Sequence, residues 1–400
     1  MVNFRSIKPF KALCLGDFLL DVYTVGRVKR ISPEAPVPVM EGLSQESRPG
    51  GAGNVVLNLR ALGGTVISLG RVGADADGET LTRTLGDLLI EPNYRTPVKN
   101  RLIAESQQLL RIDFETISPL PPLLETRAVS LLEEHIPQMQ VVAISDYGKG
   151  FLTPRVLGAA LRIAKKHHVP VLVDPKGIDF AKYRGCTLIK PNLSEAYAAA
   201  KLPNSATLDE VAAALLPVID AEHLLITRSE AGMSLFERGG RRSDFPVRSR
   251  EVKDVTGAGD TALAVIALGL ANRLDMAATV QLANIASGLS IERLGCVQVT
   301  LPEMAKRMLD FNEDPKVFDE QHMDALVHVL EGKMYSLLKL GAVREMTNAL
   351  LQTIRQQQRP LVVSVDEYND LVYALSRLPE VDYIVLNGQM MPPPRQTSSV

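Results

Sequence analysis

Short runs of apolar, β-branched residues alternate with helical patterns over roughly residues 10–300, and this rhythm limits the fold more than any other feature. The predicted strands are Ala12–Leu15, Val66–Leu69, Val141–Ser145, Val171–Val173, Thr187–Ile189 and Leu224–Thr227. The helical patterns are Asn54–Leu62, Glu79–Leu89, Arg155–His167, Leu208–Ile219 and Asp275–Ile291. Strands that are apolar throughout and separated by helices indicate a parallel sheet covered on both faces. The sequence therefore predicts an α/β fold, a doubly wound and mostly parallel sheet.

Two segments break this rhythm and look like hairpins of a separate, smaller sheet. Asp21–Met40 contains a proline-punctuated extended stretch, and Val98–Glu115 shows the alternation of a strand with one exposed face. A small sheet that projects from a domain can close over a site and exclude water. We therefore interpret segments 18–45 and 95–116 as a β-sheet lid. The alternative is that they are two ordinary surface excursions.

The pattern changes again near residue 312. Asn312–Pro315 has the composition of a linker, so we expect a first domain of residues 1–312 and a smaller C-terminal α/β segment of residues 313–390. This segment shows helical patterns at Glu320–Leu330 and Met334–Gln358, a strand-like Pro360–Val365, a further helix and a strand at Tyr383–Leu386. The polar, proline-rich residues 391–400 are expected to be disordered.

Composition excludes several classes of function. The net charge of −2 gives no general attraction to nucleic acid or to an anionic membrane. The cysteines Cys14, Cys186 and Cys296 lie far apart, which argues against a disulfide framework or a zinc site. The N-terminus has no apolar leader, and no apolar run reaches the length of a membrane span. We expect a cytoplasmic protein whose partners are small molecules.

The most informative motif is the glycine-rich stretch Thr256–Gly259, which Asp260 follows and which opens an apolar helical run, Thr261–Leu270. A loop of this kind directs free backbone N–H groups and the positive end of the helix dipole at one place, where an anion binds well. Asp260 would repel a resting phosphate. It fits if the anion is a phosphoryl group in transfer and Asp260 takes the proton from the attacking hydroxyl. The alternative is that Asp260 only caps the helix.

Three weaker motifs accompany this loop. Gly50 and Gly51 allow close approach of a ligand, and Asn54 can bond sugar hydroxyls, although glycines before a helix often form only a turn. Asp21 lies just past the first strand, where its carboxylate could accept hydrogen bonds from a polyol. Asn192 and Glu195 share one face of a helix start and could hold hydrated Mg²⁺, or could simply form a capping box.

The order of these motifs, and above all Asp254–Asp260 (Asp-Val-Thr-Gly-Ala-Gly-Asp), resembles the ribokinase family of carbohydrate kinases, also called the PfkB family. The resemblance covers about residues 10–300. It implies a ribokinase-like fold with a β-sheet lid, and transfer of the γ-phosphoryl group of ATP to a sugar hydroxyl in the presence of Mg²⁺. It also implies a homodimer, because the lid sheets of this family often pair.

The resemblance assigns a role to each matching residue. Asp260 would be the base, and the amides of Gly257, Ala258 and Gly259 would form the anion hole. The residues implied for cofactor binding are Asn192 and Glu195 (Mg²⁺ and phosphates), Thr227, Ser229 and Gly232 (nucleotide) and Asn284 (adenine). The residues implied for the sugar are Asp21, Gly50, Gly51 and Asn54, and Asp254 matches a position that helps bind a monovalent cation such as K⁺.

Narrower features resemble one branch of that family, the D-glycero-β-D-manno-heptose 7-phosphate kinases. They are the segments Arg30–Val39, Gln107–Asp113, Ser145–Gly150 and Val173–Gly177. This branch phosphorylates the anomeric hydroxyl of a sugar that already carries a phosphate, on the route to the lipopolysaccharide core. Cations must then face the far end of the substrate. The resemblance points to Lys99, Arg101, Arg111, Asp146 and Lys149 as substrate residues, although each cation alone could be a solvated surface charge.

Many relatives of this branch carry a nucleotidyltransferase domain after the kinase, which depends on a His-x-Gly-His turn. No such turn occurs in this chain, although Arg359–Pro360 and Val381–Leu386 resemble later parts of that domain. We expect residues 313–390 to be a shortened remnant without transferase activity. A dimerisation element and an unrelated appendage are the alternatives. For the whole chain the alternatives are a kinase for another sugar, or a non-catalytic sugar- or nucleotide-binding protein.

Overall fold

The computed structural model describes residues 4, 7–105, 107–247, 252–310, 316–319, 323–341 and 343–386. The chain divides into two compact units, Pro9–Val299 and the combination of Met1–Lys8 with Thr300–Val400. This division falls before helix α9 (Leu301–Asp310), whereas the sequence analysis places the boundary after residue 312. Within the described residues, none of the helices combines the length and the apolar character needed to cross a bilayer.

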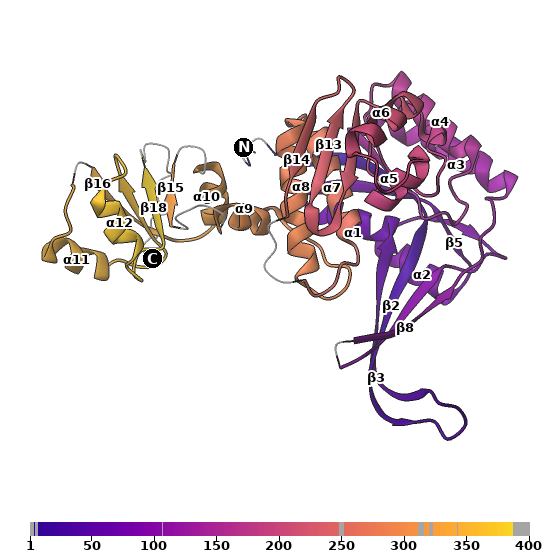
Figure 1. Cartoon of the computed structure of the whole chain (residues 1–400), viewed down its shortest axis with the longest axis horizontal. Helices are drawn as coiled ribbons and strands as arrows, with labels where there is room; N and C mark the ends of the chain where they lie inside the picture. Colours follow the sequence, from indigo (N-terminus) through magenta and orange to yellow (C-terminus); the bar gives the residue numbers. More distant parts are fainter. Residues whose placement is uncertain are drawn as a thin grey trace, which may run out of the picture. The chain divides into compact units, whose positions relative to one another are not determined.

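An eight-stranded sheet forms the centre of the first unit (Figure 1). Its spatial order is β14 (Arg242–Phe245), β13 (Met233–Glu237), β12 (His223–Thr227), β11 (Leu188–Ile189), β10 (Val171–Asp174), β9 (Val141–Ser145), β1 (Phe10–Gly16) and β4 (Gly64–Leu69). The strands from β12 to β4 pair in parallel, and β13 and β14 are antiparallel additions at one edge. All six predicted strands are present, so the predicted mostly parallel sheet is confirmed.

Helices pack on the two faces of this sheet because successive side chains of each strand point to opposite sides. Leu13 and Leu15 of β1 join one buried cluster with helices α3 (Pro122–His135), α4 (Pro154–Lys166) and α6 (Leu208–Ile219). The strands also contact α1 (Ala52–Ala61) and α7 (Ala258–Ala271), and the Cys14 thiol contacts the first residue of α1. The remaining helices of the unit are α2 (Ala76–Leu85), α5 (Leu193–Ala200) and α8 (Met276–Ile291).

One predicted helix in this unit runs too far. The helical pattern Glu79–Leu89 ends at Leu85, because Gly86 adopts a φ of 99°, a conformation that few other residues tolerate. Residues Leu89–Glu91 then form β6, which pairs with β5 (Arg71–Gly73) in a separate parallel pair. The apolar periodicity did not indicate that the helix ends at Leu85, whereas Gly86 could have indicated it.

The predicted small sheet exists and has four strands in the order β3 (Pro38–Gly51), β2 (Phe18–Ile31), β7 (Val98–Ala104) and β8 (Gln107–Phe114). Strands β2 and β3 form one antiparallel hairpin, β7 and β8 form a second, and β2 pairs in parallel with β7. The β2–β3 hairpin reaches well beyond the main sheet (Figure 1). Since β2 follows β1 almost directly, the base of this sheet stands at the carboxyl edge of the main one.

The second unit contains its own parallel sheet in the order β15 (Val317–Phe318), β18 (Tyr383–Leu386), β17 (Leu361–Val365) and β16 (Ser336–Gly341). Its other helices are α10 (Met323–Leu330), α11 (Asn348–Arg355) and α12 (Asp370–Ser376). Residues Val363, Leu371 and Ile384 belong to its buried core.

The sequence predicted parts of this second unit correctly. The strands Pro360–Val365 and Tyr383–Leu386 are confirmed as β17 and β18, and the predicted α/β character holds. The single helix predicted at Met334–Gln358 is wrong, because strand β16 and helix α11 replace it. Ser336–Gly341 is a short apolar run, and such runs do not distinguish a strand from a helix by periodicity. The predicted linker Asn312–Pro315 and the tail 391–400 lie outside the described residues.

Candidate active site

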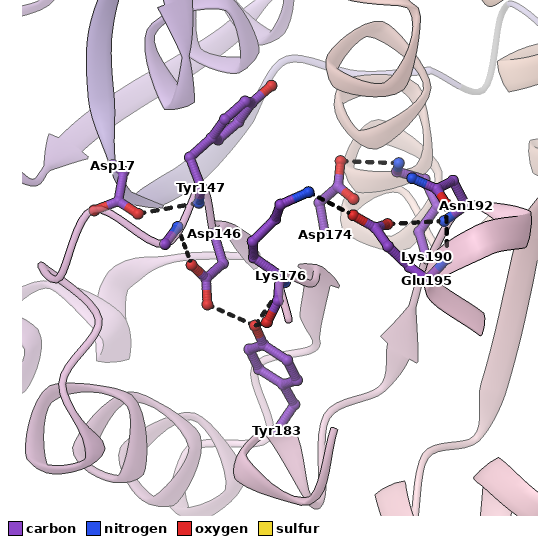
Figure 2. Close-up of polar contacts among 10 residues, drawn as sticks. Asp17, Asp146, Tyr147, Asp174, Lys176, Tyr183, Lys190, Asn192 and Glu195 are labelled. Atoms are coloured by element: carbon purple, nitrogen blue, oxygen red, sulfur yellow. Dashed lines mark hydrogen bonds and ion pairs between the residues drawn. The ribbon is translucent and has the colours of Figure 1, made fainter. Parts of the chain in front are cut away.

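Charged and polar residues follow neighbouring strands of the main sheet where each strand ends. Asp17 follows β1, Asp146 follows β9, Asp174 ends β10 and Lys190 follows β11. These strands are adjacent and parallel, so their carboxyl ends meet at one edge. Figure 2 shows these four side chains along that edge. Asp17, Asp146 and Lys190 are buried, which is unusual for charged groups without a functional reason.

The glycine loop opens helix α7 as the sequence predicts. Gly257 adopts a left-handed conformation with a φ of 79°, and the helix begins at Ala258. A Cβ atom at Gly257 would lie 2.6 Å from the Nδ2 atom of Asn54, so a larger residue would displace that amide. The first N–H groups of α7 have no partner within the helix and lie where the helix dipole is positive, an arrangement that suits an anion.

Asp260 lies in the first turn of α7 and is almost fully buried, with 3% of its surface exposed. The Nδ2 atom of Asn54 donates to one carboxylate oxygen at 3.0 Å, and the Tyr147 hydroxyl donates to the other at 3.0 Å. Burial raises the pKa of Asp260 to about 7, an effect that these two donors partly oppose. A carboxylate with this pKa can accept a proton near neutral pH, which suits a general base.

An ion pair between buried Lys190 and half-buried Asp174 lies near Gly259 of the glycine loop. The Nζ atom of Lys190 lies 2.9 Å from the Asp174 carboxylate, and a Cβ atom at Gly259 would lie 3.4 Å from the same Nζ. Burial raises the pKa of Asp174, and the Lys190 ammonium opposes that rise. Lys190 therefore places a positive charge beside the anion site.

Asn192 and Glu195 form the capping box that was the simpler interpretation of this motif. The Asn192 side chain accepts from the Glu195 N–H, and the Glu195 side chain accepts from the Asn192 N–H. Lys176 also donates to Glu195 at 2.9 Å, as Figure 2 shows. Among the described residues, no group of three or more His, Cys, Asp or Glu side chains gathers in a way that could hold a metal ion.

Of the residues expected to hold the sugar, Asn54 contacts Asp260 directly. Asp21 is buried in β2 and forms an ion pair with Arg101 of the neighbouring strand β7. A Cβ atom at Gly50 would overlap the Asp21 carboxylate, so glycine keeps that carboxylate free of steric conflict. Gly51 adopts a φ of 57° directly before α1, where Asn54 is buried. Arg101 therefore binds the carboxylate of Asp21, although the resemblance had assigned it to a substrate phosphate.

The other candidate cations differ in their partners. Lys149 forms an ion pair with Glu115 at 2.6 Å, and Arg111 forms an exposed pair with Asp113 at 2.9 Å. Lys99 instead lies 5.0 Å from the centre of the Tyr147 ring. Desolvation lowers the pKa of Lys99, the Asp21 and Asp113 carboxylates oppose this shift, and the nearby charges of Lys149 and Arg111 add to it. Lys99 thus lies among charges of both signs.

Asp146 has a structural set of contacts. It accepts hydrogen bonds from the Gly148 N–H at 2.7 Å, the Lys182 Nζ at 2.8 Å and the Tyr183 hydroxyl at 2.6 Å. Figure 2 shows the Tyr183 hydroxyl meeting the carboxylate of Asp146. With three donors already bound, Asp146 holds the turn after β9.

The residues expected to bind nucleotide lie further along the same edge. Thr227 at the end of β12 bridges to Asn192, and Ser229 and Gly232 adopt positive φ values of 48° and 86° in the following turn. Asn284 in α8 donates to the Pro246 carbonyl at 2.8 Å. Thr227 and Asn192 are thus neighbours, whereas Asn284 is bound to the segment that follows β14.

Asp254 joins two loops. Its carboxylate accepts from the Thr256 N–H at 2.9 Å and from the Gly295 N–H at 2.9 Å. These bonds connect the segment before the glycine loop with the segment after α8. Both carboxylate oxygens retain lone pairs, so the geometry is compatible with a bound monovalent cation.

Sequence reasoning assigned no individual role to four residues of this site: Asp17, Tyr147, Asp174 and Lys190. Tyr147 and Asp174 lie within the segments Ser145–Gly150 and Val173–Gly177, which were recognised only as parts of a family resemblance. A usable signal existed, because the residues of this group follow apolar strands directly or within a few positions. Their contacts with Asp260 and with the glycine loop required the strand order.

A hollow of about 900 Å³ lies at the opposite end of the same sheet. Its lining residues precede β9, β10 and β12 or end helices, for example Gln140, Pro170 and Glu222. Arg238 in its wall is paired with Asp220 at 3.0 Å. Ligands of parallel sheets bind at the carboxyl ends of the strands, so we place the active site at Asp260.

Comparison with known proteins agrees with this geometry. Residues 10–304 match the model of the pfkB family carbohydrate kinases. A protein of Trichlorobacter lovleyi named "Bifunctional protein HldE" is 38% identical, and the match covers 96% of this chain and 84% of that protein. A protein of the same name from Campylobacter jejuni is 43% identical over 76% of this chain and 66% of its own length.

Solved structures show the same fold at low identity. The ribokinase of Arabidopsis thaliana, complexed with ribose and ATP, has a TM-score of 0.59 at 17% identity, covering 75% of this chain and 99% of that one. Phosphofructokinase-2 of Escherichia coli, in complex with potassium, has a TM-score of 0.60 at 19% identity, covering 74% of this chain and 97% of that one. The expected ribokinase-like fold is confirmed. The chain belongs to the pfkB family of carbohydrate kinases.

Proposed function

We propose that this chain transfers the γ-phosphoryl group of ATP to the anomeric hydroxyl of D-glycero-β-D-manno-heptose 7-phosphate, giving the 1,7-bisphosphate for the lipopolysaccharide core. The observation that carries the proposal is Asp260, a buried carboxylate with a pKa of about 7 directly behind an anion-binding glycine loop. A base and an anion hole at one place suit in-line attack of a hydroxyl on phosphorus.

The residues divide the work as follows. Asp260 orients the sugar hydroxyl and accepts its proton. The amides of Gly257, Ala258 and Gly259, with the Lys190 ammonium nearby, stabilise the negative charge that grows on the phosphoryl oxygens. Asp21 accepts hydrogen bonds from the sugar hydroxyls, and Asn54 donates to them. Gly50 and Gly51 let the sugar approach the main chain.

Asn192 and Glu195 fit a divalent metal, because Mg²⁺ keeps most of its waters and needs few protein ligands. Their capping contacts leave lone pairs free on the amide and carboxylate oxygens. When Mg²⁺ is bound, it would neutralise part of the negative charge of the phosphates. Thr227, Ser229, Gly232 and Asn284 are proposed for the nucleotide, and Asp254 for K⁺.

Two observations favour a sugar substrate that already carries one phosphate group before the reaction. The lid presents Lys99 and Arg111, Lys149 lies in the loop after β9, and Lys99 lies beside Tyr147, whose hydroxyl contacts Asp260. The lid motifs also resemble heptose 7-phosphate kinases, and relatives with the name HldE align over most of the chain. Another phosphorylated sugar is the second candidate, because the same cations would serve it.

Turnover of ATP against a small panel tests this function. The purified chain, with Mg²⁺, is assayed against heptose 7-phosphate, fructose 6-phosphate, ribose and adenosine. We expect selective turnover of heptose 7-phosphate. Turnover of fructose 6-phosphate alone would keep the mechanism and overturn the substrate, and no turnover of any of the four would count against the whole proposal.

For the second unit we propose that it is a remnant of a nucleotidyltransferase without activity. Its parallel sheet of four strands suits that origin, and the sequence lacks the His-x-Gly-His turn. The test incubates the full chain with heptose 1-phosphate and either ATP or CTP, and measures release of pyrophosphate. We expect none above background, and steady release would contradict the proposal.

We also propose a homodimer in the cytoplasm. Leu109, Leu110 and Phe114 of lid strand β8 are exposed apolar side chains, which suits a surface that pairs with a second copy. The free, buried cysteines suit a reducing compartment. Light scattering that gives the monomer mass would overturn the dimer.

A further inference from the structure

The two hydrogen-bond donors of Asp260 come from distant parts of the chain. Asn54 is 206 residues away in α1, and Tyr147 is 113 residues away in the loop after β9. Each donates to a different carboxylate oxygen. The orientation of the carboxylate and the free energy of its charge therefore depend on how α1 and this loop are fixed.

Asp17 contacts both of these elements. Its backbone carbonyl accepts from the Ala52 N–H at 3.1 Å, at the first residue of α1 and two positions before Asn54. Its carboxylate accepts from the N–H groups of Tyr147 and Lys149 at 3.0 Å each, and of Phe151 at 3.3 Å. One residue at the end of β1 thus fastens the start of α1 and three amides of the loop.

Figure 2 shows this arrangement at the loop. The Asp17 carboxylate meets the main chain of Tyr147, while the ring of Tyr147 points away from it. Asp17 is 3% exposed, so its charge is shielded from solvent and depends on those amides. A buried carboxylate whose partners are all main-chain N–H groups of one loop holds the shape of that loop.

Tyr147 acts as a neutral donor. Desolvation and the Asp260 charge raise the pKa of its hydroxyl well above the usual value, so the proton stays on it at working pH. Other charged or titratable groups also face Asp260. Asp174 of β10 raises the pKa of Asp260, and Lys190 after β11 lowers the pKa of Asp260. Because these two form an ion pair, they oppose one another.

The thiols of Cys14 in β1 and of Cys296 also interact electrostatically with Asp260. Burial raises the pKa of both thiols above the usual value, so they remain uncharged. The neutral donors Asn54 and Tyr147 are therefore the groups that directly stabilise the ionised carboxylate.

We propose that Asp17 is a positioning residue that fixes Tyr147 and Asn54 as the paired donors to Asp260, and that Tyr147 through this bond keeps Asp260 ionised at neutral pH. This inference rests on the proposed role of Asp260 as the base. It assigns to Tyr147 and Asp17 an effect on the proton affinity of Asp260, which a purely structural role would not have.

The test is the pH profile of kcat/KM for the full chain and for Tyr147→Phe. Loss of a hydrogen bond to a carboxylate raises its pKa, so the acidic limb should move up by about one pH unit. The difference in rate should shrink at high pH, where Asp260 is ionised in both proteins. Tyr197→Phe is the matched control, because it removes a tyrosine hydroxyl that donates to a backbone carbonyl, that of Ala206.

Asp17→Asn gives a second variant. Its amide NH₂ would oppose loop N–H groups, so we expect the same direction of shift together with a lower plateau. A uniform loss in Tyr147→Phe at every pH, with no movement of the limb, would overturn the proposal. If Asp17→Asn fails to fold, Tyr147→Phe alone decides it.

A measurement without turnover separates this inference from the proposed function. The difference in Tm between each protein and its Asp260→Asn derivative is followed against pH, and the pH above which this difference levels off reports the pKa of Asp260 in the folded chain. A higher levelling pH in the Tyr147→Phe background supports the inference even if no sugar is phosphorylated. An unchanged levelling pH contradicts it even if the kinase is active.

Discussion

The two parallel sheets of this chain differ in what they bury. The first unit buries Asp17, Asp146, Asp260 and Lys190 near the carboxyl edge of its sheet. Among the described residues of the second unit, Arg307 and Ser364 are the buried polar or charged side chains. Burying a charge costs free energy, so charges are kept inside where their chemistry is needed. The comparison teaches that fold class alone does not locate a candidate site, whereas several buried charges gathered at one edge of a sheet do.

The largest expected effect comes from removing the base. Asp260→Asn should lower kcat by about 10²–10⁴-fold, since general-base catalysis contributes about that much. The measurement is ATP turnover with the best substrate of the panel. The matched control is Asp366→Asn, which changes an exposed carboxylate directly after β17 of the second unit. Equal losses of kcat in both variants would contradict the conclusion that only the first sheet carries the catalytic carboxylate.

Shortening a core side chain of the second unit should lower the stability of that unit and leave the kinase activity unchanged. Leu375 is fully buried in α12, and Leu375→Ala should cost about 2–5 kcal/mol in the free energy of unfolding of that unit. Chemical denaturation followed by circular dichroism measures the cost. Turnover of ATP should stay within about twofold of the parent in native buffer, where the first unit remains folded. A parallel loss of turnover would show that the two units are coupled.

The charge of Asp260 should lower stability at high pH. Its pKa rises from 3.8 to about 7 on folding, so the folded chain resists ionisation that the unfolded chain allows. Stability is then fully present below pH 4 and is lost as pH rises through 7. Asp260→Asn should be more stable than the parent at pH 8 by up to about 4 kcal/mol, and equal to it near pH 4.

Thermal unfolding of both proteins at several pH values measures this difference. Asp366→Asn again serves as the control, and it should show no comparable gain at pH 8. A gain for Asp260→Asn that is the same at every pH would indicate a packing effect and would contradict the role of the charge.

The smallest expected effect concerns the lid. Lys99→Ala should raise KM for a phosphorylated sugar by about 10–100-fold, because a charge-assisted hydrogen bond to phosphate is lost. KM for ATP should change little. Lys339→Ala, an exposed lysine on β16 of the second unit, is the control and should change neither constant. An unchanged KM for the sugar in Lys99→Ala would remove Lys99 from the substrate site.

The sequence predicted the main sheet well for a physical reason. Buried parallel strands are apolar throughout, and this pattern is local, so Val141–Ser145 could be recognised without knowledge of its neighbours. The pattern failed where local signals conflict. Gly86 ended a helix that periodicity extended, and Ser336–Gly341 was too short to distinguish a strand from a helix.

By itself the sequence determined the six parallel strands of the main sheet from β1 and β4 to β12, the glycine loop and the place of Asp260 in it, because these depend on local pattern and backbone freedom. Only the tertiary structure decided which groups meet Asp260. Tyr147 and Asn54 reach it from 113 and 206 residues away, and Arg101 of the lid pairs with Asp21. Those contacts depend on the order of strands in the sheet, which brings distant loops to one edge. No local pattern in the sequence specifies that order.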